Sequence, residues 1–234
     1  TQEWTNWHYD QTINQQGTQL DLALINGALE LSDQAALKLG DDIRRVSGID
    51  NPNSVAQLKQ WLSEKLGKDI DKLGKEAVNE LLEAPQVKAN PAVYYVLKKR
   101  KEMAKSSVKK YTAMGNAVCK DGRVRGLLQF YGANRTGRWA GRLVQVQNLP
   151  RNYIPELSLA RNLVKQENAA MLELTYGSLP DTISQLIRTA FVPREGYEFV
   201  VADFSAIEAR VISWLAGEDW RLEVFRTHGK IYEA

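Results

Sequence analysis

Cysteine and histidine are scarce in this sequence, and long apolar runs are absent. The 234 residues contain one cysteine and two histidines. Cys119 cannot form an internal disulfide and has no Cys or His neighbour at metal-ligand spacing, so we interpret it as an ordinary small apolar residue in a reducing cytosol. His8 and His228 each stand alone, and neither is assigned a role. No run of about 18 apolar residues occurs and no secretory signal opens the chain, so the sequence predicts a cytoplasmic protein without a membrane span.

Internal repeats and low-complexity tracts are also absent, which excludes a repeat architecture. The composition, 44% hydrophobic and 25% charged, is that of an ordinary globular chain with enough apolar residues for one or two domains. The chain begins at Thr1 without a methionine and stops at Ala234 in a helix-like stretch. We therefore expect a piece of a longer polypeptide.

Positive charge is concentrated in the middle of the chain. Residues 98–151 contain 14 lysines and arginines against Glu102 and Asp121, a net charge of +12, whereas the whole chain carries only +3. A basic middle between acidic flanks suggests a polyanionic partner. A solvated basic surface explains the charge alone equally well.

The first half of the sequence has the apolar spacing of a series of helices. Ser54 is a good N-cap for one of them, and Gly67 closes the same helix. Gly40 is expected to end an earlier helix, and Pro91 to begin a long basic one. The predicted helices span residues 4–15, 20–39, 55–66, 75–83 and 91–114.

The second half mixes strands and helices. Arg123 to Tyr131 is predicted as a strand, and 132–150 is a segment rich in Gly and Arg. Further helices are expected near residues 155–165 and 181–189. The short apolar run 198–202 is typical of a buried strand, and a helix capped by Ser205 and ended by Gly217 is expected after it. Helices followed by strands with flanking helices predict an α+β fold.

Asp203 stands between the predicted strand and the predicted helix. Phosphoryl transfer needs fixed oxygen ligands for Mg²⁺, because catalysis is mostly positioning and charge neutralisation. A carboxylate held at a strand end suits that role. It also suits a helix cap, which is the more common role of an isolated aspartate in this setting. Both interpretations stay open on the position alone.

The residues around Asp203 resemble a known family. The run Asp203-Phe204-Ser205-Ala206-Ile207-Glu208-Ala209-Arg210 is similar to motif A of family A DNA polymerases, Asp-Tyr-Ser-x-Ile-Glu-x-Arg. Upstream, Ile187-Arg188-Thr189-Ala190-Phe191, Thr136-Gly137-Arg138 and Gln147-Asn148-Leu149-Pro150 resemble that family's blocks at matching separations. The first half resembles the thumb more loosely, at Ile13-Asn14, Gly17 and Asp21. The stretch between Pro150 and Arg188 is more like the phage and prophage members.

The resemblance implies a helical thumb-like region with a lead-in helix over residues 1–118. It implies the N-terminal part of a palm, an antiparallel sheet with flanking helices, over 119–234. The partners implied are primer–template DNA, dNTPs and the remaining palm and fingers of the same polypeptide, in a host cytoplasm if the protein is phage-encoded.

For the nucleotide site, the resemblance makes Asp203 a ligand of two catalytic Mg²⁺ ions, with the backbone carbonyl of Phe204 as a further ligand. The triphosphate would lie over Ser205, Ala206 and Ile207. Glu208 would pack against the sugar's 2′ position, where a ribose would bring a polar group into a filled site. Phe204 replaces the common Tyr, and Ala206 replaces the common Gln, which puts a side-chain contact there in doubt.

For DNA, the resemblance places a donor-rich segment against the primer–template minor groove. There, donors check pairing without selecting sequence, because every base pair shows similar acceptors. Arg138, Gln147 and Asn148 match the family directly; Arg142 is specific to this chain, and Gln145 replaces the usual Asn. Arg188 is expected beside them. The basic helix would follow the duplex phosphates through Lys98, Lys99, Lys105 and Lys109.

The predicted function is therefore that of a DNA-directed DNA polymerase fragment. The helix that holds the triphosphate and the hairpin that carries the second metal carboxylate are not in the sequence, so the fragment alone is expected to be inactive. Two alternatives are a single-subunit RNA polymerase palm fragment, which Glu208 disfavours, and a non-catalytic primer–template binding module in which Asp203 is only a cap.

Overall fold

The computed structural model describes residues 1–103 and 108–229. The chain divides into two compact units, Thr1–Glu195 (unit 1) and Gly196–Ala234 (unit 2), and each is described by itself. The predicted division into thumb and palm segments at residue 118 stays a prediction. Lys105, one of the predicted phosphate contacts, lies outside the described residues.

Unit 1 begins with helices whose ends follow local sequence signals. Asp21 accepts a hydrogen bond from the backbone N–H of Leu24 and starts α2. Ser54 does the same for Gln57 at the start of α3, and Gly67 ends α3 in the left-handed conformation, as predicted. The helices are α1 (Gln2–Gln16), α2 (Leu22–Ser47), α3 (Val55–Leu66), α4 (Lys75–Glu83), α5 (Pro85–Lys88), α6 (Pro91–Met103) and α7 (Val108–Ala117).

The prediction that Gly40 ends a helix is wrong. Helix α2 continues to Ser47, because Ile43 extends the buried stripe that includes Leu39 beyond the glycine. The end comes instead at Gly48, which has a φ of 73°. The long helix expected over 91–114 is described as α6 and α7 on either side of residues 104–107.

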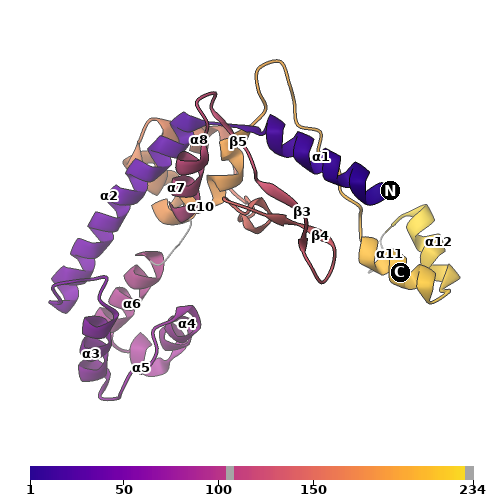
Figure 1. Cartoon of the computed structure of the whole chain (residues 1–234). Coiled ribbons are helices and arrows are strands. Elements are labelled where there is room, and N and C mark those ends of the chain that lie inside the picture. Colours follow the sequence, from indigo (N-terminus) through magenta and orange to yellow (C-terminus); the bar gives the residue numbers. More distant parts are fainter. Residues whose placement is uncertain (104–107, 230–234) are drawn as a thin grey trace. The chain divides into compact units, whose positions relative to one another are not determined.

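Helix α2 belongs to both apolar cores of unit 1. Its N-terminal half, with Leu24 and Leu31, packs in one cluster with α7 and α8, and its C-terminal part contributes Ile43 to a second cluster with Leu58 and Val96. Figure 1 shows the two ends of α2 beside these two groups of helices. A Cβ on Gly27 would come within 2.2 Å of the Val164 carbonyl oxygen, so α2 and α8 approach there at backbone distance.

The strands of unit 1 form small antiparallel sheets. Strands β1 (Thr18–Leu20), β2 (Arg123–Val124) and β5 (Phe191–Val192) pair in the order β2-β1-β5. Strands β3 (Leu128–Ala133) and β4 (Arg138–Gly141) form a hairpin. The single strand predicted over 123–131 is therefore two strands, and Gly126, with a φ of 68°, turns the chain between them.

Short helices complete unit 1. The predictions near 155–165 and 181–189 are confirmed, whereas α9 was not predicted. Asn168 caps α9 by accepting from the Met171 N–H. These elements are η1 (Val146–Asn148), α8 (Leu157–Lys165), α9 (Ala169–Tyr176), α10 (Leu179–Leu186) and η2 (Ile187–Ala190). Helices around small antiparallel sheets confirm the predicted α+β class. No helix among the described residues is long and apolar enough to cross a membrane.

Unit 2 consists of an extended segment, then α11 (Ile207–Leu215) and α12 (Asp219–Thr227). The buried strand predicted over 198–202 is wrong for this structure. Val200 and Val201 are 88% and 89% exposed, and no described residue pairs with the segment in a ladder. An apolar run becomes a strand only where a neighbouring strand pairs with its backbone N–H and C=O groups. None of the described residues pairs with this segment.

Candidate functional site

Asp203 lies in unit 2, in the exposed extended segment before α11. The predicted Ser205 cap is wrong: Ala206 occupies the N-cap position with a φ of 50°, and the helix begins at Ile207 without a side-chain cap. Asp203 does not cap α11 either, because no hydrogen bond joins its carboxylate to the first turn among the described contacts. The carboxylate is therefore presented to solvent ahead of a helix N-terminus.

Arg210 fastens the Asp203 segment to the helices behind it. Its Nε donates to the Ser205 carbonyl oxygen at 2.8 Å, and its guanidinium carbon lies 4.4 Å from the centroid of the Phe225 ring. Phe225 is the buried residue of α12, and α12 packs against α11. Arg210 thus joins the turn over 203–206 to the α11–α12 pair through one hydrogen bond and one cation–π contact.

The remaining predicted nucleotide-site residues are also exposed, except Ala206, which is half-buried. Phe204 is 79% exposed, Ile207 is 46% exposed, and Glu208 lies exposed in the first turn of α11. Acidic side chains are favourable in that turn because the helix dipole is positive there. Among the described residues, no group of three or more His, Cys, Asp or Glu side chains converges as a metal cluster would. The Asp203 carboxylate and the Phe204 carbonyl are oxygen donors of the kind that divalent cations take.

The predicted minor-groove residues lie in unit 1, in a segment that we call the donor block, residues 138–150. Its apolar side chains anchor it: Val144 is fully buried and Leu149 is 6% exposed. The polar side chains between these anchors are exposed to solvent. They are Arg142, Gln145, Gln147 and Asn148, with Arg138 exposed at the start of the block.

Polar contacts hold the backbone of the donor block at several places. Lys110 of α7 donates to the Val144 carbonyl oxygen at 2.6 Å. Gln147 donates to the Trp139 carbonyl oxygen at 3.3 Å. The donor block is therefore tied to α7 and to its own strand β4, while its other donors point away from the core.

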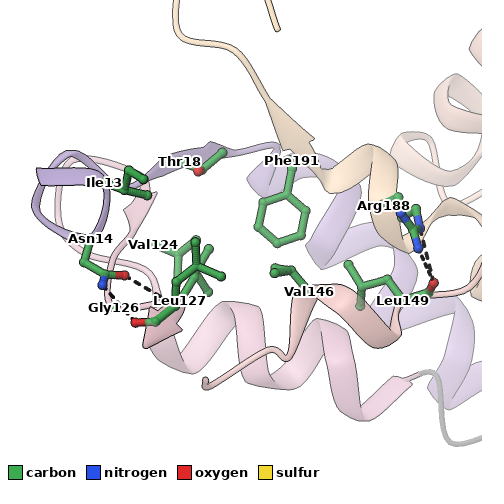
Figure 2. A pocket seen from close by; sticks show the side chains of 12 residues that line it. Ile13, Asn14, Thr18, Val124, Gly126, Leu127, Val146, Leu149, Arg188 and Phe191 are labelled. Atoms are coloured by element: carbon green, nitrogen blue, oxygen red, sulfur yellow. Dashed lines mark hydrogen bonds between the residues drawn. The ribbon is translucent and has the colours of Figure 1, made fainter. Parts of the chain in front are cut away.

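Arg188 attaches the C-terminal end of the donor block through more than one hydrogen bond. Its Nη2 donates to the Leu149 carbonyl oxygen at 2.8 Å, and its Nε donates to the Pro150 carbonyl oxygen at 2.9 Å. Figure 2 shows the guanidinium directed at Leu149. Arg188 was predicted to contact DNA; in the structure its described partners are carbonyl groups of the donor block.

A pocket of about 320 Å³ lies behind the donor block. Val146 and Leu149 line it from the block, Phe191 lines it from β5, and Asn14 and Arg188 supply polar groups (Figure 2). The Asn14 side-chain amide donates to the Leu128 carbonyl and accepts from the Leu128 N–H, at 2.8 and 3.0 Å. Both polar groups are thus engaged with backbone, and the pocket offers mainly apolar walls.

The predicted phosphate contacts lie in mixed electrostatic surroundings. Lys99 pairs with Glu102 at 3.5 Å. Lys98 and Lys99 border a groove of about 330 Å³ that also contains Asp42 and Glu173. Lys109 is exposed on α7. The surface around α6 is therefore not uniformly positive, despite the net charge of the segment.

Comparisons with known proteins identify the family of this chain. The family model of DNA polymerase family A matches residues 27–234. The chain belongs to DNA polymerase family A. It is 58% identical over 228 residues to the DNA polymerase of Bacillus phage SP02, covering 97% of this chain and 35% of that protein. It is 27% identical over 218 residues to the thermostable DNA polymerase I of Thermus thermophilus, covering 90% of this chain and 22% of that protein. No solved structure matches the chain significantly.

The family A match confirms the resemblance, including its phage character. The chain spans about a third of the length of the phage relative and about a fifth of the bacterial one. Within it, the structure brings Arg188 and the donor block together in unit 1, whereas Asp203 and Glu208 lie in unit 2. The roles of these residues in a family A polymerase stay predictions.

Several residues that hold unit 1 together were not predicted. Asp21 was noted only as part of the thumb resemblance, yet it caps α2 and pairs with Arg161 and Lys165, both at 2.6 Å. Lys110 lies in the helix predicted over 91–114 but was not among the lysines given a role there, yet it holds the donor block. Trp139, the residue directly after Arg138, was given no role in the sequence analysis. Neither charge nor motif marks the contacts of Asp21 with Arg161 and of Lys110 with Val144, because each joins residues far apart in the sequence.

Proposed function

We propose that this chain is part of a DNA-directed DNA polymerase that extends a primer with dNTPs by two-metal nucleotidyl transfer. The observation that carries the proposal is the motif A run at residues 203–210, with the Asp203 carboxylate exposed ahead of α11. Membership of family A and 58% identity to a phage DNA polymerase support it. The relatives of this chain are DNA polymerases, so nothing favours the RNA polymerase alternative.

Asp203 and the Phe204 carbonyl would hold divalent cations, two Mg²⁺ ions in the complete enzyme. Such ions supply charge neutralisation on the transferred phosphoryl group and activation of the primer 3′-hydroxyl. Residues Ser205 to Ile207, at the N-terminus of α11, would bind the triphosphate, where backbone N–H groups and the helix dipole favour negative charge. Glu208, in the next turn, would occupy the space beside C2′ and reject a ribose.

The donor block would contact the duplex near the primer terminus. Arg138, Arg142, Gln145, Gln147 and Asn148 would donate to minor-groove acceptors. Arg188 would act by holding the Leu149 and Pro150 carbonyls, so that the block keeps its form. Lys98, Lys99, Lys105 and Lys109 would supply sequence-neutral phosphate contacts, which weaken as salt concentration rises.

A chimeric enzyme tests the proposal, because the chain covers only part of its relatives. This chain replaces the matching segment of the Bacillus phage SP02 DNA polymerase, and primer extension is measured with dNTPs and Mg²⁺. Asp203→Ala is expected to lower the extension rate at least about 10³-fold, since it removes a metal ligand. Glu198→Ala removes a nearby exposed carboxylate and serves as the matched control.

Equal extension by the Asp203→Ala and Glu198→Ala chimeras would reduce Asp203 to a structural residue. The sugar gate is tested in the same chimera by comparing dNTP with rNTP incorporation after Glu208→Ala. Unchanged discrimination would remove Glu208 as the gate.

A further inference from the structure

Helix α1 carries a buried carboxylate on an otherwise solvent-facing helix. All of α1 is described, and Asp10 is its one buried residue, at 3% exposed. An ionised carboxylate with so little access to water is costly unless hydrogen bonds replace its hydration. A helix as exposed as α1 has no need of such a residue for its own stability, so the partners of Asp10 explain its place.

Those partners link α1 to the β3–β4 hairpin. The indole Nε1–H of Trp139 donates to Asp10 Oδ1 at 2.9 Å. The Asn14 side chain donates to Asp10 Oδ2 at 3.2 Å and also bonds both backbone groups of Leu128. Asp10 therefore receives one donor from β4 directly and is joined through Asn14 to the start of β3.

Trp139 connects this attachment to the donor block. Its backbone carbonyl accepts from the Gln147 side chain at 3.3 Å, and Arg138 is the residue before it on β4. Its ring packs edge-on against Phe130 with centroids 5.2 Å apart. A Cβ on Gly141 would come within 2.0 Å of Gln147 Oε1, so Gln147 fits closely against the same strand. Movement of the Trp139 ring would carry the β4 backbone, and with it the positions of Arg138 and Gln147.

We propose that Asp10 is a positioning residue for primer–template recognition, acting through the Trp139 indole to set the place of Arg138 and Gln147. The inference rests on the proposed function and names a residue in the lead-in helix, outside every matched motif. Asp10 itself does not contact DNA in this scheme. It fixes the strand from which the minor-groove donors project. The donors are therefore ordered before DNA binds, and binding does not carry the entropic cost of ordering them.

Primer–template binding by the 234-residue chain tests the inference. The dissociation constant for a fluorescent primer–template is measured by anisotropy at fixed salt for the wild type, Asp10→Ala, Trp139→Phe, Gln147→Ala and the control Glu3→Gln. Trp139→Phe keeps the ring and removes only the indole donor. Both Asp10→Ala and Trp139→Phe are expected to weaken binding about 3- to 10-fold, and Glu3→Gln, an exposed acid of the same helix, is expected to leave it unchanged.

Double variants separate positioning from general loss of structure. Asp10→Ala with Gln147→Ala is expected to weaken binding less than the product of the single effects, by at least about threefold. The effects of Asp10→Ala and Lys109→Ala are expected to multiply, because Lys109 lies on α7, outside the hairpin. A simple loss of folded protein would affect both pairs alike. If Asp10→Ala does not fold in thermal unfolding, the Trp139→Phe series carries the same comparison.

The outcomes distinguish the two levels of the proposal. If the wild type binds primer–template and neither Asp10→Ala nor Trp139→Phe changes the dissociation constant, the positioning role is overturned. The proposed function stays intact in that case. Multiplicative effects of Asp10 and Gln147 also overturn the positioning role. The wild-type chain is also compared with a variant in which the polar side chains of the donor block are replaced by alanine. If the wild type binds primer–template no more tightly than this variant, the DNA contact of the proposed function is overturned, and the positioning role with it.

Discussion

Arg188 and Leu149 are joined by paired hydrogen bonds, from Nε at 3.2 Å and from Nη2 at 2.8 Å to the same carbonyl oxygen. Arg188 lies in η2 and Leu149 at the end of the donor block, so the contact links two of the family A blocks that precede motif A. The fork of the guanidinium fits this arrangement, and an ammonium cannot reproduce it. The contact gives a structural reason for an arginine beside the donor block that does not depend on DNA.

Arg188→Lys is therefore expected to lower stability by about 1 kcal/mol and to weaken primer–template binding by the donor block. Thermal unfolding and anisotropy measure the two effects on the same protein. Arg151→Lys changes an exposed arginine close to Pro150 and is the control. Weaker DNA binding with unchanged stability would return Arg188 to the role of a direct DNA contact.

Gly27 and Gly115 form a matched pair for testing the close approach of α2 to α8. Gly27→Ala would bring Cβ to 2.2 Å from the Val164 carbonyl oxygen, whereas nothing lies within 4 Å of a Cβ at Gly115. Gly27→Ala is expected to cost about 1–3 kcal/mol through overpacking. Gly115→Ala is expected to add about 0.4–1 kcal/mol, since alanine is the better helix former. Urea unfolding gives both values, and a gain at both positions would contradict the packing described here.

Tyr111 is the largest fully buried side chain of unit 1, and its hydroxyl donates to the Ile183 carbonyl oxygen at 2.8 Å. Burial raises the pKa of Tyr111 above its ordinary value. The folded chain therefore keeps the phenolic proton when the unfolded chain loses it. Stability from this group is complete below about pH 10 and declines as pH rises further.

Tyr111→Phe is expected to lower stability by about 1–2 kcal/mol at neutral pH. Because the variant has no phenol at position 111, its free energy of unfolding is also expected to fall less than that of the wild type as pH rises into the alkaline range. Chemical unfolding from pH 7 upward measures both, with the half-exposed Tyr94→Phe as control. An identical alkaline profile for the wild type and Tyr111→Phe would show that Tyr111 ionises freely in the folded chain.

Asp121 and its arginines hold the C-terminal end of α1. Arg125 and then Arg123 hydrogen-bond the Asp121 carboxylate and hold its pKa well below the ordinary range. The same arginines donate to the Gln15 and Gln16 carbonyl oxygens. Because the pKa is depressed, this contribution to stability is present above the ordinary carboxyl pKa, about 3.9, and is lost as pH falls through the folded-state value.

NMR titration of the Asp121 carboxyl is expected to give a midpoint below the ordinary value, and Arg125→Gln is expected to raise it. Arg135→Gln, an exposed arginine in the neighbouring hairpin turn, is expected to leave the midpoint unchanged. An Asp121 midpoint at the ordinary value in the wild type would mean that these ion pairs do not persist in solution.

The purified chain is expected not to extend a primer by itself. A two-metal site needs several fixed ligands, and the described residues contain no cluster of three acidic, histidine or cysteine side chains. Gel-based extension with dNTPs and Mg²⁺ checks this, with the phage chimera as the positive control. Extension by the wild-type chain that Asp203→Ala abolishes would show that the ligands are complete within these residues.

Local signals in the sequence determined much of the helical part. Ser54 and Gly67 bound α3 where their chemistry predicts, because a hydroxyl cap and a left-handed glycine satisfy backbone groups without help from elsewhere. The motif A run and the blocks around Arg138, Gln147 and Arg188 sufficed to identify the family, since such matches depend on residue order alone.

Tertiary structure decided where local preference meets distant partners. Helix α2 continues through Gly40 because Ile43 packs into a core formed by residues further along the chain. Residues 198–202 have the composition of a strand, but a strand needs a neighbour for its backbone, and no described residue provides one. Asp10 faces Trp139 across 129 positions of sequence. No local pattern encodes such a pair, because the Trp139 indole reaches the Asp10 carboxylate only in the folded chain.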